Sequence, residues 1–342
     1  MKMPPVIYEK ILRPALFSID PETVHELAMW ALSGVSGSRT LINLLSHRHD
    51  PRLEKTVFGL KFPNPVGLGA GFDKNAVALP AWQALGFGFI EAGTVTGRAQ
   101  PGNVKPRVFR LPEQGALINR LGFNNEGADA IAQRLSLLKK AGLWPTIPVG
   151  INLGKSKVTP LEEATADYLL SFERLQHFGD YFVLNVSSPN TPNLRKLQDS
   201  AALDELFGHM QRRNADNKPI LVKIAPDLEW EAIEEILALV QEHKIAGVIA
   251  TNTTIDHSSV APEKQQQGGL SGEPLRKRST EIVRFITSKS SVPVIAVGGI
   301  MDAGAAMEKF DAGAALVQIY TGFVYRGPAL IADICKRLLA RR

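Results

Sequence analysis

The segment YFVLNVSSPNTPNLR, residues 181–195, decides the fold class because a buried strand and a polar loop meet within it. Five of its first six residues are aromatic, β-branched or otherwise apolar, which is typical of a strand covered on both faces. From Ser187 onward the segment is polar, and Pro189 and Pro192 interrupt it. It contains neither a carboxylate nor a histidine that could activate its serines. Their chemistry therefore depends on what else lies at the end of this strand.

The same pattern of an apolar strand followed by a helix recurs from about residue 64 onward. Eight segments are nearly continuous in apolar residues: 65–71, 89–95, 147–154, 181–187, 219–225, 246–252, 293–299 and 314–320. Such runs indicate parallel strands buried on both faces. Eight strands that alternate with helices predict an α/β protein with a (β/α)8 TIM barrel. A doubly wound open sheet is the alternative, but the count of eight and the polar residues at nearly every strand end favour the barrel.

Two parts of the chain do not fit the repeat. Residues 1–48 precede any strand and predict an N-terminal helical extension, so we divide the chain into 1–48 and 49–342. One helix is expected around residues 6–16. A second begins after Asp20, a good N-cap residue, with Pro21 at the first helical position. Between the second and third strands, the segment PRVFRLPEQGALINRLGF predicts a hairpin on the strand-end side of the barrel.

Composition excludes several classes of protein. The 342 residues carry an excess of five positive charges, but Lys and Arg are dispersed, so we expect no nucleic-acid partner. Cys335 is the only cysteine, which rules out a disulfide or a cysteine metal site within the chain. No apolar run approaches the roughly 18 residues needed to span a bilayer, and the N-terminus lacks the pattern of a signal peptide. We therefore expect a cytosolic protein, or one that lies on a membrane without crossing it.

Polar residues follow most of the strands, at the end of the barrel that carries active sites in this fold. They are Asp73, Lys74, Thr94, Asn152, Asn185, Ser188, Lys223, Thr251, Asn252, Thr253, Tyr320 and Thr321. Histidine is absent from this set and carboxylates are sparse, which argues against a metal hydrolase and a glycosidase. We predict no metal. Any one asparagine could be a backbone cap, but several at successive strand ends match the edge of a neutral heterocycle with C=O and N–H groups.

Lys223 lies inside an apolar strand, so its ammonium needs an anionic partner. Two partners are open: an anion in the barrel mouth, or an ion pair with Glu91. The glycines of 268–272 and 297–300 offer backbone N–H groups at loops where barrels commonly bind phosphate. Amides that suit the edge of a heterocycle, glycine loops that suit a phosphate and a lysine that suits a delocalised anion together suggest bound FMN. A barrel that binds a phosphate ligand without redox chemistry is the alternative.

Nine segments resemble the dihydroorotate dehydrogenase family, specifically its membrane-associated, quinone-reducing class 2. They are GLGAGFDKNA, EAGTVTGRAQPGNVKPRVFRL, INRLGFNN, LNVSSPNTPNLR, LVKIAPD, ATNTT, GGLSGEPL, AVGGI and LVQIYTGF, and together they span essentially the whole chain. The resemblance implies an FMN-binding (β/α)8 barrel that oxidises dihydroorotate to orotate in pyrimidine biosynthesis. Soluble class 1 enzymes are similar but carry Cys in the position of Ser188. The only cysteine here is Cys335, so class 1 is disfavoured, as is a soluble enzyme that reduces fumarate or a partner subunit.

The resemblance also implies roles for individual residues. FMN is expected to contact Ala70, Gly71, Phe72, Asp73, Lys74, Thr94, Asn152, Asn185, Lys223, Thr251, Gly272, Gly299, Tyr320 and Thr321. The substrate is expected to contact Lys74, Asn119, Arg120, Leu121, Gly122, Phe123, Asn185, Asn190, Asn252 and Thr253. Ser188 is expected to be the general base that takes a proton from C5 of dihydroorotate while a hydride leaves C6. Ser187 is the rival, but neighbours in an extended stretch point to opposite sides, and the family pattern selects Ser188.

The N-terminal helices are implied to form an apolar passage to the flavin, with His25, Arg110 and Tyr320 at the quinone head. Without the family resemblance, the sequence instead favours His25 as a helix-surface residue beside Glu22 or Glu26.

Apolar contacts, not charge, would have to hold this extension on a membrane. The four Lys and Arg of residues 1–40 balance four Asp and Glu, so exposed apolar side chains would have to supply the binding. We expect a peripheral, monomeric protein on the cytoplasmic side of the inner membrane, with dihydroorotate, orotate and quinone as partners. The alternative is that both helices pack flat on the barrel bottom.

Overall fold

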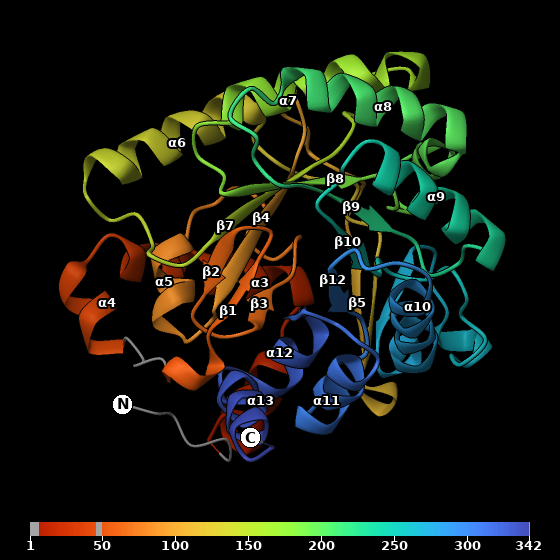
Figure 1. Ribbon diagram of the computed structural model, residues 1–342. Coiled ribbons are helices and arrows are strands. Elements are labelled where there is room, and N and C mark those ends of the chain that lie inside the picture. The colour runs from red at the N-terminus through yellow and green to blue at the C-terminus, as the bar shows by residue number, and fades with distance from the viewer. Residues whose placement is uncertain (1–6, 46–49, 342) are drawn as a thin grey trace.

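Eight parallel strands close into a barrel in the computed structural model, which describes residues 7–45 and 50–341 (Figure 1). The strands are β3 (Val66–Leu68), β4 (Phe89–Val95), β7 (Val149–Leu153), β8 (Tyr181–Asn185), β9 (Ile220–Ile224), β10 (Gly247–Ala250), β12 (Val294–Val297) and β13 (Leu316–Ile319). They pair in this order around the barrel, and β13 returns to β3. Each strand lies within one of the eight predicted segments, so the (β/α)8 barrel is confirmed and the open sheet is excluded.

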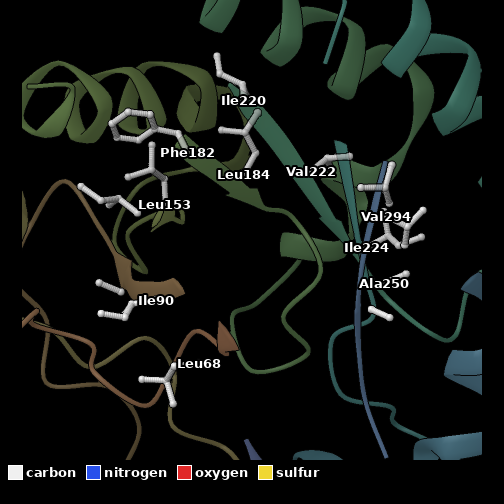
Figure 2. Packing of buried hydrophobic residues seen from close by; sticks show 14 of the residues in the cluster. Leu68, Ile90, Leu153, Phe182, Leu184, Ile220, Val222, Ile224, Ala250 and Val294 are labelled. Carbon is white, nitrogen blue, oxygen red and sulfur yellow. The ribbon is translucent and has the colours of Figure 1, made fainter. Parts of the chain in front are cut away.

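Helices form the outer layer of the barrel (Figure 1). They are α5 (Leu79–Ala84), α6 (Ala128–Lys140), α7 (Ala164–Leu175), α8 (Ser200–Arg213), α9 (Trp230–Glu242), α10 (Arg276–Lys289), α11 (Ala303–Asp311), α12 (Thr321–Arg326) and α13 (Ala329–Leu339). Outward strand residues such as Phe182, Leu184 and Val222 pack beneath these helices (Figure 2). Because successive strand residues alternate between faces, the residues between them point into the barrel.

The N-terminal end of the barrel is closed by an apolar plug. Phe89 and Tyr181 point inward there, and Phe62 covers them from a hairpin of β1 (Lys55–Val57) and β2 (Leu60–Phe62). The Phe62 and Phe89 rings meet edge to face with centroids 5.3 Å apart. Gly150 leaves room for this layer, since a Cβ there would lie 2.1 Å from the Tyr181 ring. The sequence reading did not predict this hairpin.

A small antiparallel sheet covers the opposite end, where the strands finish. Strands β5 (Val108–Leu111) and β6 (Ala116–Asn119) form the predicted hairpin. Strand β11 (Gly269–Gly272) pairs with β6, and this addition was not predicted. The glycines of 268–272, read from the sequence as a phosphate loop, are therefore mostly strand, because their backbone is paired with residues 116–119.

The N-terminal extension lies against the strand-end side of the barrel. It comprises the π-helical turn η1 (Tyr8–Leu12), α2 (Arg13–Phe17), α3 (Pro21–Ser36) and α4 (Arg39–Leu45). Asp20 caps α3 as predicted, accepting a hydrogen bond from the Thr23 backbone N–H at 2.9 Å. Helix α4 was not predicted. Residue 6 of the first predicted helix and the boundary at 48 lie outside the described residues.

Three contacts fix the position of this extension. Glu22 of α3 pairs with Arg107 at 2.7 Å, and the Tyr8 hydroxyl donates to the Val324 carbonyl at 2.7 Å. The Arg110 guanidinium donates to the Ile19 carbonyl at 2.9 Å. Since β1 and β2 close the barrel bottom, the alternative that the helices pack there is wrong. Across the described ranges, no helix has both the length and the apolar character needed to cross a membrane.

Candidate active site

A cavity opens at the strand ends, beneath the small antiparallel sheet. Seven of the eight barrel strands, or the loops that follow them, contribute to its wall, and β6 and β11 form part of its cover. The lining combines exposed glycine backbone with amides, hydroxyls and two lysines, Lys74 and Lys223. The strand ends where the sequence predicts a site therefore surround a cavity with a polar floor.

A buried carboxylate organises the floor. Glu91, in the middle of β4, has no exposed surface. It accepts a hydrogen bond from the Asn152 side-chain amide at 2.6 Å and a second from the amide of Gln318. The Lys223 ammonium lies 3.5 Å from the same carboxylate. A buried carboxylate is costly unless charge and hydrogen bonds compensate it, and here both do. Lys223 also lines the cavity, so the ion pair and the cavity position left open by the sequence occur together.

A chain of amides runs from Glu91 toward the loop after β8. The Asn152 side-chain oxygen accepts hydrogen bonds from the Thr94 hydroxyl at 2.5 Å and from the Asn185 amide at 3.1 Å. The Asn185 oxygen in turn accepts from the Asn252 amide at 3.2 Å. Because Glu91 can only accept hydrogen bonds, it fixes which way each amide in the chain is turned.

The two adjacent serines of this loop face different surroundings. The Ser187 side chain is fully buried, donating to Asn185 Oδ1 at 3.2 Å and accepting from Asn252 Nδ2 at 3.0 Å. Ser188 instead lines the cavity, and its hydroxyl oxygen accepts from the Asn190 backbone N–H at 3.2 Å. On the same loop, the buried Thr191 hydroxyl has no hydrogen-bond partner among the described residues. Only one serine of the pair therefore faces the space where a ligand would lie.

Most residues predicted for the cofactor line this cavity, and three do not. Those on the lining are Ala70, Gly71, Lys74, Thr94, Asn185, Lys223, Thr251, Gly272, Gly299, Tyr320 and Thr321. Asn152 lies behind the wall in the amide chain. Phe72 packs edge to face on Trp82. The Asp73 carboxylate accepts from the Val77 and Ala78 backbone N–H groups at 2.8 and 2.9 Å, so it serves the turn that leads into α5.

The residues predicted for the substrate lie together on the lining, with one exception. Those on the lining are Lys74, Asn119, Leu121, Gly122, Phe123, Asn185, Asn190, Asn252 and Thr253. The Arg120 guanidinium turns away, donating to the Pro106 carbonyl at 2.9 Å and stacking over the Phe109 ring at 4.8 Å. The sequence reading missed Gln318, although a polar residue within the apolar run 314–320 was a usable signal.

The loop after β12 needs glycine for close packing. Gly299 has a positive φ of 71°, and a Cβ there would lie 2.2 Å from the Arg276 Cα at the start of α10. Beneath this contact the buried Lys309 ammonium donates to the Thr280 hydroxyl at 2.7 Å and the Arg276 carbonyl at 3.2 Å. Burial lowers the pKa of Lys309 to about 7. The loop therefore brings backbone to the cavity edge beside the first turn of a helix.

A second, more apolar cavity lies between the N-terminal helices and the small sheet. It is lined by His25, Arg110 and Tyr320, the three residues predicted for quinone, together with apolar residues of α3. The His25 ring lies 5.2 Å from the Phe72 ring, so reading His25 as a surface residue was wrong. Burial and the nearby charge of Lys74 lower the pKa of His25 to about 3, which keeps its imidazole neutral near pH 7.

The two cavities share one wall. Five residues line both of them: Lys74, Val108, Leu117, Leu121 and Tyr320. Burial lowers the pKa of Lys74 to about 8, while the charge of Glu22 opposes that shift. A ligand in one cavity is thus separated from a ligand in the other by a single layer of side chains.

Comparison with known proteins identifies this arrangement. The family model described as "Dihydroorotate dehydrogenase" matches residues 52–341. A protein of Gloeobacter violaceus named "Dihydroorotate dehydrogenase (quinone)" is 53% identical over 97% of this chain and 94% of its own length. A protein of the same name from Christiangramia forsetii is 52% identical over 98% of this chain and 99% of its own. The crystal structure of Eimeria tenella DHODH with ferulenol has a TM-score of 0.86, at 37% identity, covering 94% of this chain and 91% of that one.

The Glu91 ion pair leads to a stability prediction. Replacing Glu91 by Gln should lower the free energy of unfolding by about 3–5 kcal/mol, because the buried Lys223 ammonium loses its counter-charge. Lys223→Met should also destabilise, and the double variant should lose less than the sum of the two, since the residues interact directly. Urea unfolding followed by circular dichroism measures this. Asp311→Asn, in an exposed pair with Arg341, is the control and should change little. Strict additivity of the two buried substitutions would contradict the coupling.

Proposed function

The chain belongs to the dihydroorotate dehydrogenase family, and we propose that it oxidises dihydroorotate to orotate with FMN as the first electron acceptor and a quinone as the second. The observation that carries the proposal is the cavity at the strand ends. There Ser188 lines a cavity whose floor carries oriented amides and Lys223, and a second cavity adjoins it across one wall. Relatives that carry the quinone-dependent name at 53% and 52% identity over nearly their full length support the same reaction.

The cavity has the chemistry that a flavin mononucleotide needs. Thr94, Asn185, Lys223 and Thr251 present hydroxyl, amide and ammonium groups to a planar ring with C=O and N–H edges. Where the lining reaches the start of α10, glycine backbone and a threonine hydroxyl suit a phosphate; these residues are Gly272, Gly298, Gly299 and Thr321. When bound, the flavin supplies a hydride acceptor. Lys223 contributes positive charge at the floor, which favours a reduced and anionic ring.

Ser188 acts as the general base in this proposal. Ser188 is only 5% exposed, so little water competes for its hydroxyl. A serine hydroxyl is a poor base in water, and it serves here because the carbonyl beside C5 of dihydroorotate makes that proton acidic and the site is dry. Asn119 and Asn190, hydrogen-bonded to each other at 3.2 Å, and Asn252 hold the polar edge of the substrate. The Thr191 hydroxyl on the same loop, which has no hydrogen-bond partner within residues 7–45 and 50–341, can carry the proton onward.

The second cavity is assigned to the quinone. Neutral His25, Arg110 and Tyr320 offer hydrogen bonds to a quinone head, and the apolar lining suits its hydrocarbon tail. The Arg110 guanidinium is held in place by the Leu16 and Ile19 carbonyls at 3.2 and 2.9 Å. Residues 1–48 would then be the segment for quinone access, and residues 49–342 the barrel that binds FMN and substrate.

The outer surface of the N-terminal helices supports binding to a membrane. Eight of the thirteen exposed large apolar side chains that the structure describes belong to residues 7–45: Ile7, Ile11, Leu12, Ile19, Leu27, Trp30, Leu41 and Leu44. Exposed apolar groups concentrated on one extension favour insertion into a lipid interface. We assign the protein to the cytoplasmic face of the inner membrane, as a monomer with dihydroorotate, orotate and quinone as its ligands.

The reaction is tested by anaerobic mixing of the protein with dihydroorotate while flavin absorbance is followed. The wild-type flavin should bleach, and denatured protein should release about one FMN per chain. Ser188→Ala should keep its FMN and bind orotate but bleach roughly two to four orders of magnitude more slowly, the usual range for a lost general base. Ser187→Ala is the matched control and should do far less damage. The opposite ranking of the two variants would reject Ser188 as the base.

The lowered pKa of Lys74 leads to a pH prediction for orotate binding. Orotate is an anion and favours the charged ammonium, so affinity should be highest below about pH 8. Above that pH the free protein loses the Lys74 charge, and the Kd should rise by up to about tenfold per pH unit. Titration of orotate by flavin difference absorbance between about pH 6.5 and 9 measures it. Lys74→Met should bind weakly at every pH and lose the dependence, whereas Lys277→Met should retain it. A flat profile in the wild type would count against Lys74 as a ligand.

The exposed apolar face of α3 leads to a membrane prediction. Leu27 and Trp30 are 53% and 74% exposed and lie three residues apart on one face. The double substitution Leu27→Ser and Trp30→Ser should weaken vesicle binding by at least about tenfold, because each buried apolar side chain contributes on the order of 1.5–3 kcal/mol. Dihydroorotate-driven bleaching should remain unchanged. Leu137→Ser, at a position 60% exposed on α6, is the control. If the double variant and Leu137→Ser lost vesicle binding equally, a role of α3 in membrane binding would be contradicted.

A further inference from the structure

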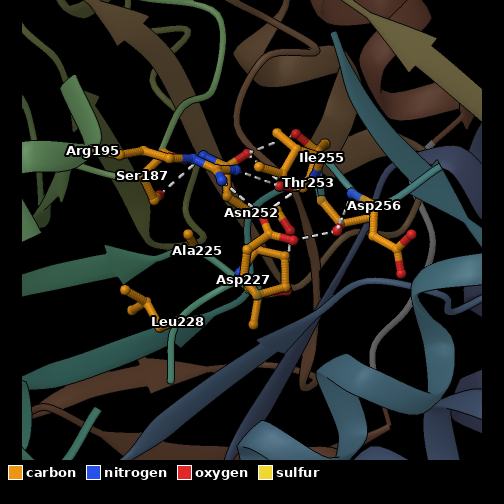
Figure 3. Close-up of polar contacts among 12 residues, drawn as sticks. Ser187, Arg195, Ala225, Asp227, Leu228, Asn252, Thr253, Ile255 and Asp256 are labelled. Carbon is orange, nitrogen blue, oxygen red and sulfur yellow. Dashed lines mark hydrogen bonds and ion pairs between the residues drawn. The ribbon is translucent and has the colours of Figure 1, made fainter. Parts of the chain in front are cut away.

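One arginine ties together the three loops that surround Ser188. Arg195 belongs to the 3-10 turn η5 (Leu194–Gln198), which follows β8. Its Nε donates to the Ser187 carbonyl at 3.1 Å, and its Nη2 donates to the Thr253 carbonyl at 3.0 Å (Figure 3). Its Nη1 pairs with Asp227 Oδ2 at 2.7 Å. Each of the three guanidinium nitrogens therefore binds a different segment of the chain.

Asp227 completes the connection from the loop after β9. Its Oδ1 accepts a hydrogen bond from the Thr254 hydroxyl, and its Oδ2 accepts from the Ile255 backbone N–H at 3.3 Å (Figure 3). The side chains of Arg195 and Asp227 are only 22% and 20% exposed, so water screens their attraction less than at an open surface. We call Arg195, Asp227 and Thr254 the loop clamp.

The clamp acts on the backbone that carries the proposed base. The Ser187 carbonyl belongs to the peptide bond that leads into Ser188, so a hydrogen bond to it restricts how Ser188 can turn. On its other side the Ser187 hydroxyl is held by Asn185 and Asn252 at 3.2 and 3.0 Å. The same guanidinium holds the Thr253 carbonyl, and Thr253 lines the cavity. The Arg195 side chain thus fixes the position of Ser188 relative to the part of the cavity wall that Thr253 forms.

We propose that Arg195 is a positioning residue which, with Asp227 as its counter-ion, sets the distance between the Ser188 hydroxyl and C5 of the substrate. Arg195 does not line the cavity, so it acts through Ser188 and not by touching the substrate. Loss of the clamp would let the loop after β8 shift against the loop after β10. A displacement of about 1 Å between reacting groups costs roughly 100-fold in rate. The inference rests on the proposed role of Ser188.

The experiment compares Arg195→Met with the wild type in anaerobic stopped-flow bleaching by dihydroorotate. Arg195→Met should retain FMN and bind orotate within a few-fold of wild type, while bleaching about 100-fold more slowly. Dihydroorotate deuterated at C5 should show a larger isotope effect in Arg195→Met, because removal of that proton becomes the slow step. Arg195→Lys keeps the charge but cannot hold three segments, so it should show a smaller loss of the same kind and serves if the Met variant folds poorly.

The matched control is Arg39→Met. The Arg39 guanidinium also holds two loop carbonyls, those of Ala141 and Gly142, at 3.1 and 3.4 Å, but none of these residues lines the cavity or belongs to the loop clamp. Its substitution should leave the bleaching rate and the isotope effect near wild type. An equal loss in Arg39→Met, or a bleaching rate for Arg195→Met within about threefold of wild type, would overturn the proposal.

Combining Arg195→Met with Ser188→Ala separates this inference from the function on which it rests. If Arg195 acts through Ser188, the double variant should bleach no more slowly than Ser188→Ala alone. A double variant that loses the product of both effects would show that Arg195 acts independently, and the proposal would fail. Full-speed bleaching in Ser188→Ala would instead reject the base assignment itself, whatever Arg195 does.

Discussion

The buried carboxylate of Glu91 is the constraint on which the polar end of the barrel depends. A charge with no exposed surface must be surrounded by donors, and the neighbouring strands supply them from Asn152, Gln318 and Lys223. Because Asn152 turns its amide toward Glu91, its oxygen must face Thr94 and Asn185. The orientation passes along the chain until Asn185 and Asn252 engage the Ser187 side chain. Ser188, the next residue, is the one that lines the cavity.

This arrangement explains how a barrel without a histidine at its strand ends can prepare a site for redox chemistry. The amides are neutral, so they can match a heterocycle edge without a large desolvation cost once their orientation is fixed. The charged side chains that line the first cavity are both cationic: Lys223 at the floor and Lys74 at the wall shared with the second cavity. Negative charge that develops on a ligand is therefore met by fixed positive groups, which is the form of stabilisation that needs least rearrangement.

Sequence reasoning recovered what depends on local pattern and missed what depends on tertiary pairing. The eight strands were found because burial on both faces leaves continuous apolar runs, and Asp20 was found because an N-cap is a local hydrogen bond. Strand β11 was missed because a glycine-rich segment has no strand signal until β6 lies beside it. Most residues selected by the motif resemblance lie on the cavity lining, but the resemblance could not show that Asp73 turns to backbone N–H groups or that Arg120 stacks outward on Phe109.

The proposed flavin ligands and the proposed base lie on different kinds of structural element. Residues proposed to hold the flavin come largely from strand ends, where the closed barrel fixes their geometry, whereas Ser188 lies on a loop held by side-chain hydrogen bonds. A loop can admit substrate and release product, but it places a base accurately only if its backbone is tied down. The N-terminal extension adds a separate apolar cavity that meets the first only at the wall containing Lys74 and Tyr320. Under the proposed function, a polar acid in the first cavity and an apolar quinone in the second would approach one cofactor from different sides.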